Sequence, residues 1–279
     1  MVSYHKLISA FRSFGFRREL PVITHIGSEL DEKVKGGLPT FMGALLSTVD
    51  NVLLPAFTYS TMVIPHAGPP DNNINYGNHD DENTRASIYS HTLPSECGNQ
   101  QAIDILKAFP GTYRSSHPIF SFYGLGLDIA LINHEPETPY YPIKKLEQLG
   151  GWVLLADAEP IQNYSIHYAE KLAGRKQFLR WALTPHGIAA CPHYPGCADG
   201  FNKLNYYLHD ELKQADMHNL ILSAIPLSIL IKTSVTLMQE DPFALLCNDL
   251  NCARCNIVRE DIKSKMSGRW RPEKGINSM

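Results

Sequence analysis

The residues best suited to chemistry are His167 and Glu170, which lie three positions apart in residues 163–170 (NYSIHYAE). Asn163 or Ser165 can cap a helix that begins here. Helical spacing places the histidine and the glutamate on one face, where the carboxylate can orient the imidazole. Such a pair is often only a surface ion pair, but a histidine supported in this way is also suited to act as a general base near neutral pH.

Elements that could position this pair alternate along the chain. Apolar runs predict buried strands at residues 22–24, 52–57 and 152–156. Apolar residues at helical spacing predict helices at residues 38–49, 102–109 and 201–212, and the apolar segment 220–231 is expected to be a buried helix. Strands that alternate with helices imply an α/β fold, with a mixed and mainly parallel sheet flanked by helices.

The length and the pattern of the chain suggest its organisation. The 279 residues suit a single α/β domain over residues 1–279. Residues 58–96 lack regular periodicity and are rich in Pro, Gly, Asn and Asp, which is typical of a functional loop or of disorder. We interpret them as an ordered, irregular substrate-binding loop. Residues 185–279 are expected to form a helical, cysteine-containing C-terminal segment.

Composition excludes some classes of protein. The chain is 44% hydrophobic and 19% charged with a net charge of −3, and it has no basic run with interleaved aromatic residues, so no nucleic-acid partner is indicated. Lys6 and Arg12 interrupt the apolar pattern of residues 1–15, which favours an amphipathic helix over a signal peptide. Residues 220–231 are too few to span a bilayer. We therefore expect a cytoplasmic protein without a membrane partner, whose cysteines are thiols or metal ligands.

Four segments follow one another in a recognisable order. They are residues 25–58 (His-Ile-Gly-Ser, a Gly-Gly pair, then an apolar strand), 109–124 (with Ser-Ser-His-Pro-Ile-Phe-Ser-Phe), 142–155 and 163–170. Over about residues 20–175 this order resembles the aminoglycoside 3-N-acetyltransferase family. The motif pair S-x-H-P-x-x-S-F and N-x-S-x-H-x-A-E is specific enough to make coincidence a poor explanation.

The resemblance implies transfer of an acetyl group from acetyl-CoA to an amine. His167 would act as the general base and Glu170 as its supporting carboxylate. The oxyanion of the tetrahedral intermediate would need donors, which the hydroxyl of Ser115 or Ser121, or backbone N–H groups, could supply. His117 would either line the cleft where pantetheine meets the base, or form a structural turn with its ring bonded to the backbone.

The cofactor is expected to contact the first two of these segments. Gly36 and Gly37 open a helix whose N-terminus could bind the CoA pyrophosphate, with charge added by Lys35, although they could equally form a plain helix-start turn. His25 would lie near the cofactor or serve as a structural histidine. The residues that we expect to bind the cofactor are His25, Ser28, Lys35, Gly36, Gly37, Ser115, His117, Phe120 and Ser121.

The acceptor is expected to bind the loop at residues 58–96, where Tyr76 supplies aromatic surface and Asp80, Asp81 and Glu82 supply negative charge for a cationic amine. The chain departs from the family at Gly27 and before Asn163. The alternative is therefore a diverged family member that acts on another amine, or a catalytically weak protein that binds CoA or a small ligand. The oligomeric state stays open.

Five of the six cysteines come late in the chain and suggest a competing interpretation. Cys252 and Cys255 have zinc-knuckle spacing, and with Cys197, Cys247 or His193 they could hold a structural zinc, which would make the tail a zinc-stabilised interaction module. This requires two distant clusters to meet in space. We favour reduced, half-buried thiols and assign no metal ligands from the sequence. The sixth cysteine, Cys97, lies in no local motif that would indicate a cysteine hydrolase.

Overall fold

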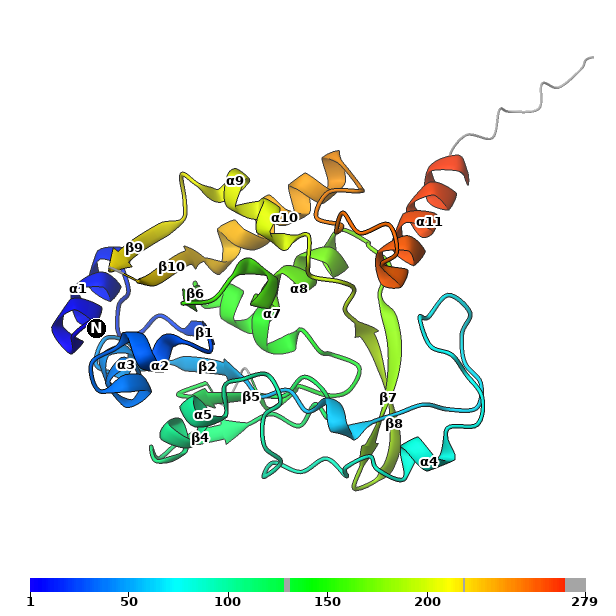
Figure 1. Cartoon of the computed structure of the whole chain (residues 1–279), viewed down its shortest axis with the longest axis horizontal. Coiled ribbons are helices and arrows are strands. Elements are labelled where there is room, and N and C mark those ends of the chain that lie inside the picture. The colour runs from blue at the N-terminus through cyan, green and yellow to red at the C-terminus, as the bar shows by residue number, and fades with distance from the viewer. Residues whose placement is uncertain (128–130, 218, 269–279) are drawn as a thin grey trace, which may run out of the picture.

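A seven-stranded mixed sheet forms the centre of the structure, a computed structural model that describes residues 1–127, 131–217 and 219–268 (Figure 1). The strand order is β4-β5-β2-β1-β6-β10-β9. The bounds are β1 (Val22–Ile26), β2 (Val52–Pro55), β4 (Thr112–Arg114), β5 (Phe122–Leu125), β6 (Trp152–Ala156), β9 (Lys213–Met217) and β10 (Leu220–Pro226). The three strands expected from the apolar runs are confirmed as β1, β2 and β6.

Parallel pairing is confined to the middle of this sheet. β1 pairs in parallel with β2 on one side and with β6 on the other, with Val22 opposite both Val52 and Trp152. The remaining neighbours are antiparallel. The mixed α/β sheet flanked by helices is confirmed, but the parallel part is smaller than expected. The carboxyl ends of β2, β1 and β6 meet at one edge, where α/β proteins commonly build their sites.

The sheet contains more antiparallel pairing than expected partly because of the apolar segment 220–231. The prediction of one buried helix for this segment is wrong. Residues Leu220–Pro226 form β10, and α10 begins at Leu227. Apolar content alone does not distinguish a buried strand from a buried helix. Pro226 marks the change, because a proline would break a helix interior but is accepted at a strand end and directly before a helix.

Helices cover both faces of the sheet because side chains alternate along each strand. Val22, Val52 and Leu154 belong to the core beneath one set of helices, whereas Ile23, Leu53 and Val153 belong to the core beneath the other. The first set is α1 (Tyr4–Phe14), α3 (Gly37–Leu46) and α5 (Gln100–Lys107), and the second is α7 (Tyr141–Gln148), α8 (Ser165–Leu172) and α10 (Leu227–Glu240).

A second, three-stranded sheet lies beside the first and includes part of the irregular segment. Its order is β3 (Met62–Val63), β7 (Phe178–Thr184) and β8 (Gly187–Tyr194). Residues 58–96 thus contain β3, the turn η1 (Tyr59–Thr61) and the short helix α4 (Asp80–Asn83). The other short elements are α2 (Leu30–Lys33), η2 (Pro160–Gln162), η3 (Phe201–Lys203) and α9 (Leu204–Leu208).

Residues 185–279 were expected to be helical, but the described part of this segment, residues 185–217 and 219–268, contributes β8, β9 and β10 as well as helices. The last described helix, α11 (Ala253–Gly268), lies at the edge of the molecule (Figure 1). It packs on a small core of its own, separate from the two cores of the main sheet. Among the described residues, no helix is long and apolar enough to cross a membrane.

Candidate active site

A cavity of about 420 Å³ opens at the carboxyl edge of the parallel strands. His25 and Ile26 end β1 at this cavity, and Pro55 ends β2. One wall comes from the segment after β6 and from α8, and includes His167. Another part of the wall comes from residues 194–199, together with Cys252 and Arg254. The fold therefore brings together segments that are far apart in the sequence.

His167 begins a chain of buried polar contacts. Its Nδ1 lies 2.6 Å from Oε2 of Glu170, and Oε1 of the same carboxylate accepts a hydrogen bond of 2.9 Å from Nη1 of Arg175. Arg175 also donates to the backbone carbonyls of Pro242 and Ala244, at 2.9 and 2.6 Å. The three side chains are each at least nine-tenths buried. The pair expected from the spacing is therefore a buried His–Glu–Arg chain rather than a surface ion pair.

The local sequence explains how α8 holds this chain. The side-chain oxygen of Asn163 accepts the N–H of Ser165 at 3.1 Å, which satisfies one of the free donors at the helix start. After the helix, Gly174 adopts a left-handed conformation with φ of 76°, which a glycine accepts without strain. The N–H of Arg175 then bonds back to the carbonyl of Glu170 at 3.0 Å. The helix end thus turns Arg175 back towards the carboxylate.

Arg175 was missed by the sequence analysis. The signal was available, because a basic residue directly after a helix-ending glycine can reach back to the last turn. Burial alone would raise the pKa of Glu170, but the hydrogen bond from His167 and the charge of Arg175 outweigh it, so the pKa of this carboxyl lies below its usual value. A charged carboxylate can only accept, so Nδ1 of His167 carries the proton and Nε2 keeps its lone pair in the neutral ring.

His25 provides a second histidine at the cavity, and no described residue forms an ion pair with it. It is 3% exposed, and its Nε2 makes no hydrogen bond with the described part of the chain. Burial lowers the pKa of His25 to about 4, so the ring is neutral near pH 7. Phe57, Phe120 and Tyr164 pack together and give the same cavity an aromatic surface.

The segment 115–121 lies mostly in the core. Ser115, His117 and Ser121 are fully buried and none of them lines the cavity; of this segment, Phe120 does. Nδ1 of His117 accepts the N–H groups of Ile119 and Phe120 at 3.1 and 3.0 Å, as in the structural-turn alternative. Burial lowers the pKa of His117 to about 3. The cleft position expected for His117 is therefore corrected to a core position.

The two serine hydroxyls are also committed to structural contacts. Oγ of Ser115 accepts the N–H of Phe122 at 2.8 Å and lies 2.9 Å from Nδ1 of the buried His134. Oγ of Ser121 donates to the carbonyl of Ala56 at 2.7 Å. Neither hydroxyl faces the cavity, so the expectation that they supply oxyanion donors or bind the cofactor does not fit this geometry.

The turn at Gly36–Gly37 is already occupied by a carboxylate. Both glycines have positive φ and open α3, as expected. However, Oδ1 of Asp31 accepts the N–H of Leu38 at 2.6 Å, where a phosphate oxygen would have to bind. A phosphate at this helix start would also be repelled by the carboxylate. Lys35 is exposed beside this turn. The geometry therefore favours the helix-start turn over the pyrophosphate site.

The turn after β1 explains one departure from the family pattern. A Cβ on Gly27 would lie 1.7 Å from the backbone oxygen of Asp157, so no larger residue fits here. Lys33 holds the same region with bonds of 2.9 and 2.8 Å to the Asp157 carboxylate. Ser28 follows as an exposed residue at the carboxyl end of β1. A glycine at position 27 is thus required by the close approach of two backbone segments.

The residues expected to bind the acceptor do not line the cavity. Asp80, Asp81 and Glu82 form the exposed helix α4, and Glu82 bonds to His79 at 2.8 Å. The hydroxyl of Tyr76 accepts a hydrogen bond from Asn72 at 2.7 Å, and the ring packs against Trp181. Among the described residues around the cavity, the carboxylate is that of Asp199 and the strong cation is Arg254.

Asp199 and Arg254 were missed because no local motif surrounds either of them. Cys97 also lines the cavity, but its Sγ lies near Oγ of Ser95 rather than near a histidine. Burial raises the pKa of this thiol, which is the wrong direction for a nucleophile. The geometry thus offers no support for a cysteine hydrolase.

Comparisons with known proteins agree with this architecture. A family model described as aminoglycoside 3-N-acetyltransferase matches residues 28–189. The chain resembles the YokD protein from Bacillus subtilis at 17% identity and a TM-score of 0.73, covering 86% of this chain and 94% of that one. A search of curated proteins found no match.

Two further solved structures carry ligands in their descriptions. One is a mutant of aminoglycoside acetyltransferase AAC(3)-IVa in complex with a gentamicin, at 16% identity and a TM-score of 0.70, covering 93% of this chain and 97% of that one. The other is AAC-IIIb in a binary complex with CoASH, at 19% identity and a TM-score of 0.67, covering 86% and 97%. At these identities the likeness establishes the shared fold.

Proposed function

Because the chain belongs to the aminoglycoside 3-N-acetyltransferase family and is an acyltransferase of that kind, we propose that it transfers the acetyl group of acetyl-CoA to an amino group of an aminoglycoside or a similar amine. Structures of the same fold bind CoASH and a gentamicin, which supports both substrates. The observation that carries the proposal is the buried His167–Glu170–Arg175 chain at the wall of the cavity.

His167 is the general base in this proposal. Nε2 takes a proton from the amine as the amine nitrogen attacks the thioester carbonyl carbon, so that an N–C bond forms. The C–S bond then breaks, and the CoA thiolate takes the proton from the His167 imidazolium, which returns the base to its neutral form. The imidazolium that forms is stabilised by Glu170, whose own charge is held by Arg175. Burial of all three groups strengthens these contacts because little water screens them.

His25 is the proposed donor to the oxyanion of the tetrahedral intermediate. It lines the same cavity, its ring is neutral near pH 7, and its buried Nε2 is unpaired within the described residues. A neutral imidazole with a proton on Nε2 can donate one hydrogen bond to an oxyanion. Ser28, at the carboxyl end of β1, is the proposed contact for the adjoining part of CoA.

A different amine is the second candidate for the acceptor. Within the described part of the chain, Asp199 is the one carboxylate that lines the cavity, and Arg254 brings a positive charge to the same wall. A polycationic aminoglycoside would need more negative charge at this surface than Asp199 supplies. The arrangement therefore also suits an amine with a single positive charge, which Asp199 would bind.

A thiol-release assay with acetyl-CoA separates these possibilities. The assay compares aminoglycosides, linear polyamines and simple monoamines as acceptors. Turnover with an aminoglycoside supports the first proposal, and turnover with monoamines alone supports the second. The matched control is His186→Ala, because His186 is exposed in the turn between β7 and β8 and lies outside the cavity. Protein that binds CoA but turns over none of these amines contradicts the proposed activity.

A further inference from the structure

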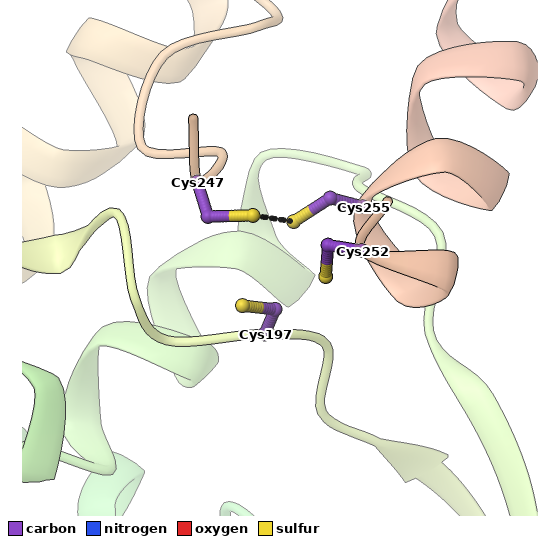
Figure 2. A group of neighbouring side chains, drawn as sticks. All are labelled: Cys197, Cys247, Cys252 and Cys255. Carbon is purple, nitrogen blue, oxygen red and sulfur yellow. Dashed lines mark hydrogen bonds between the residues drawn. The ribbon is translucent and has the colours of Figure 1, made fainter. Parts of the chain in front are cut away.

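Four cysteine side chains converge, as Figure 2 shows, and two of them, Cys197 and Cys252, line the cavity. Cys197 comes from the loop after β8, and Cys247 comes from the loop after α10. Cys252 and Cys255 come from the start of α11. Their four sulfur atoms all lie within 4.8 Å of one another. The two clusters that are distant in the sequence therefore meet in space, which is the condition that a metal site had to satisfy.

The spacing of the sulfurs fits one tetrahedral metal ion. Zinc–thiolate bonds of about 2.3 Å place the sulfurs of a tetrahedral site roughly 3.8 Å apart. Cys247 and Cys255 have their sulfurs 3.4 Å apart, and the whole group lies within 4.8 Å. Three of the four residues are buried, and Cys252 is partly exposed. Small shifts of the sulfurs would give the tetrahedral spacing, with Cys247 and Cys255 moving slightly apart and the wider pairs moving closer.

Backbone groups near the sulfurs suit thiolates. The N–H of Asp199 points at Sγ of Cys197 at 3.5 Å, a contact that stabilises a negatively charged sulfur. Cys252 directly precedes α11, and Cys255 lies in its first turn, where the partial positive charge of the helix start favours thiolates. Four free thiols gain nothing comparable from these donors, because a neutral thiol is a weak acceptor.

The packing of α11 supplies a reason for such a site. The helix is anchored by a small core of seven buried residues, three of which are cysteines of the cluster: Phe178, Cys197, Leu246, Cys247, Cys255, Val258 and Ile262. Hydrogen bonds from Arg254 to Gly196 and from Arg259 to Cys247 add to this contact. A core this small anchors a peripheral helix weakly, and small cores of this kind commonly depend on a metal or a disulfide.

We propose that Cys197, Cys247, Cys252 and Cys255 bind one structural Zn²⁺ ion as four thiolates. Binding converts the four thiols to thiolates and releases their protons. All four positions are filled by protein, so the ion holds no water and does no chemistry. Its effect is to fasten α11 and the loop 245–252 to residues 196–199.

The zinc site also connects to the cavity. Cys197 and Cys252 line the same cavity as His167, and Asp199 and Arg254, each two residues further along the chain, also line it. Zinc would therefore fix the wall that carries both of these charges. This consequence rests on the proposed function, but the presence of the metal does not, so the two can fail separately.

Metal analysis of the full-length protein, purified under reducing conditions without added chelator, tests the proposal. We expect about one zinc ion per chain, and cobalt-substituted protein should show the intense visible absorption of a tetrahedral tetrathiolate site. Cys252→Ser should lose most of the bound zinc, whereas Cys191→Ala should keep it, because Cys191 is buried in β8 outside the cluster. A strong chelator should lower the melting temperature of wild type but not of Cys252→Ser.

The cobalt spectrum of wild type keeps the test decisive even if a variant fails to fold. Absence of stoichiometric zinc both as purified and after reconstitution with zinc would overturn the proposal. Zinc that stays bound in Cys252→Ser would overturn the ligand assignment. A disulfide between two of the four cysteines, detected by mass spectrometry without reduction, would replace the metal with a covalent link.

Discussion

Two histidine-containing segments stand out in the sequence, and the fold uses them in different ways. In α8, His167 faces the cavity and has a buried carboxylate on its other ring nitrogen. In residues 115–121, His117 is fully buried, is not among the residues that line this cavity and accepts two backbone N–H groups. The first ring borders the cavity, as the proposed general base must, whereas the second shapes a turn.

The difference lies in what surrounds each ring rather than in the motif. Glu170 is three residues from His167 on a helix, so spacing alone places the carboxylate beside the imidazole. His117 precedes a proline in a turn, and its surroundings come from His134 and Phe120. A short motif can therefore indicate a family without indicating which of its polar residues reach the ligand.

The largest effect is expected when His167, the histidine that faces the cavity, is replaced. We expect His167→Ala to lower kcat by roughly two to four orders of magnitude, because the amine loses its base. The melting temperature and CoA binding should change little by comparison. The measurement is thiol release under saturating acetyl-CoA, with His186→Ala as the control. Turnover close to wild type in His167→Ala would remove His167 from the mechanism.

Glu170→Gln tests the support of the base. An amide offers one oxygen, so it cannot accept from Arg175 and from Nδ1 of His167 as the carboxylate does. We expect kcat to fall by about one to two orders of magnitude, less than for His167→Ala. The acidic limb of the pH–kcat profile should move to lower pH, since the imidazolium loses a stabilising charge. An unchanged profile would make Glu170 a structural residue.

His117→Asn tests the structural role of the second segment. An Asn side chain can still accept the N–H two residues on, but it does not titrate. In wild type the unfolded chain binds a proton near the ordinary His pKa of 6.5, whereas folded His117 does so only near 3. The contribution of neutral His117 to the free energy of unfolding is therefore fully present above about pH 6.5. It is lost as the pH falls towards 3, and the loss reaches about 2 kcal/mol at pH 5.

We expect the variant to lose less stability than wild type between pH 7 and pH 5, as measured by denaturant unfolding at each pH. Activity at pH 7, corrected for folded protein, should be close to wild type. His25 and His134 are also buried with lowered pKa values, so the variant retains part of the pH dependence. Identical pH profiles for the two proteins would contradict the buried, neutral state of His117. A large loss of kcat would return it to the active site.

The sequence predicted the local parts of the molecule best. β1, β2, β6, α3 and α5 follow from apolar runs and periodicity, α8 follows from its capping residues, and the contact between His167 and Glu170 follows from helical spacing. β10 was mistaken for a helix because apolar runs look alike in both states. The wall with Asp199, Cys252 and Arg254 could not be predicted, since it forms only when the loop after β8 meets the start of α11.

The smallest effect is expected at the acceptor site. The test compares Asp199, in the wall that could not be predicted, with the acidic residues of the irregular loop 58–96. Asp199→Asn should raise KM for a cationic amine by about 1.5-fold to fivefold, as expected for one exposed charge, with little change for acetyl-CoA. The penalty should shrink at high salt, because exposed charges are screened. The matched variant neutralises Asp80, Asp81 and Glu82 of α4, which the sequence favoured. If only the α4 variant raises KM, the acceptor reaches the cavity across the loop, and Asp199 has no part in binding it. If only Asp199→Asn does, recognition of the acceptor depends on the same wall that the cysteine cluster holds.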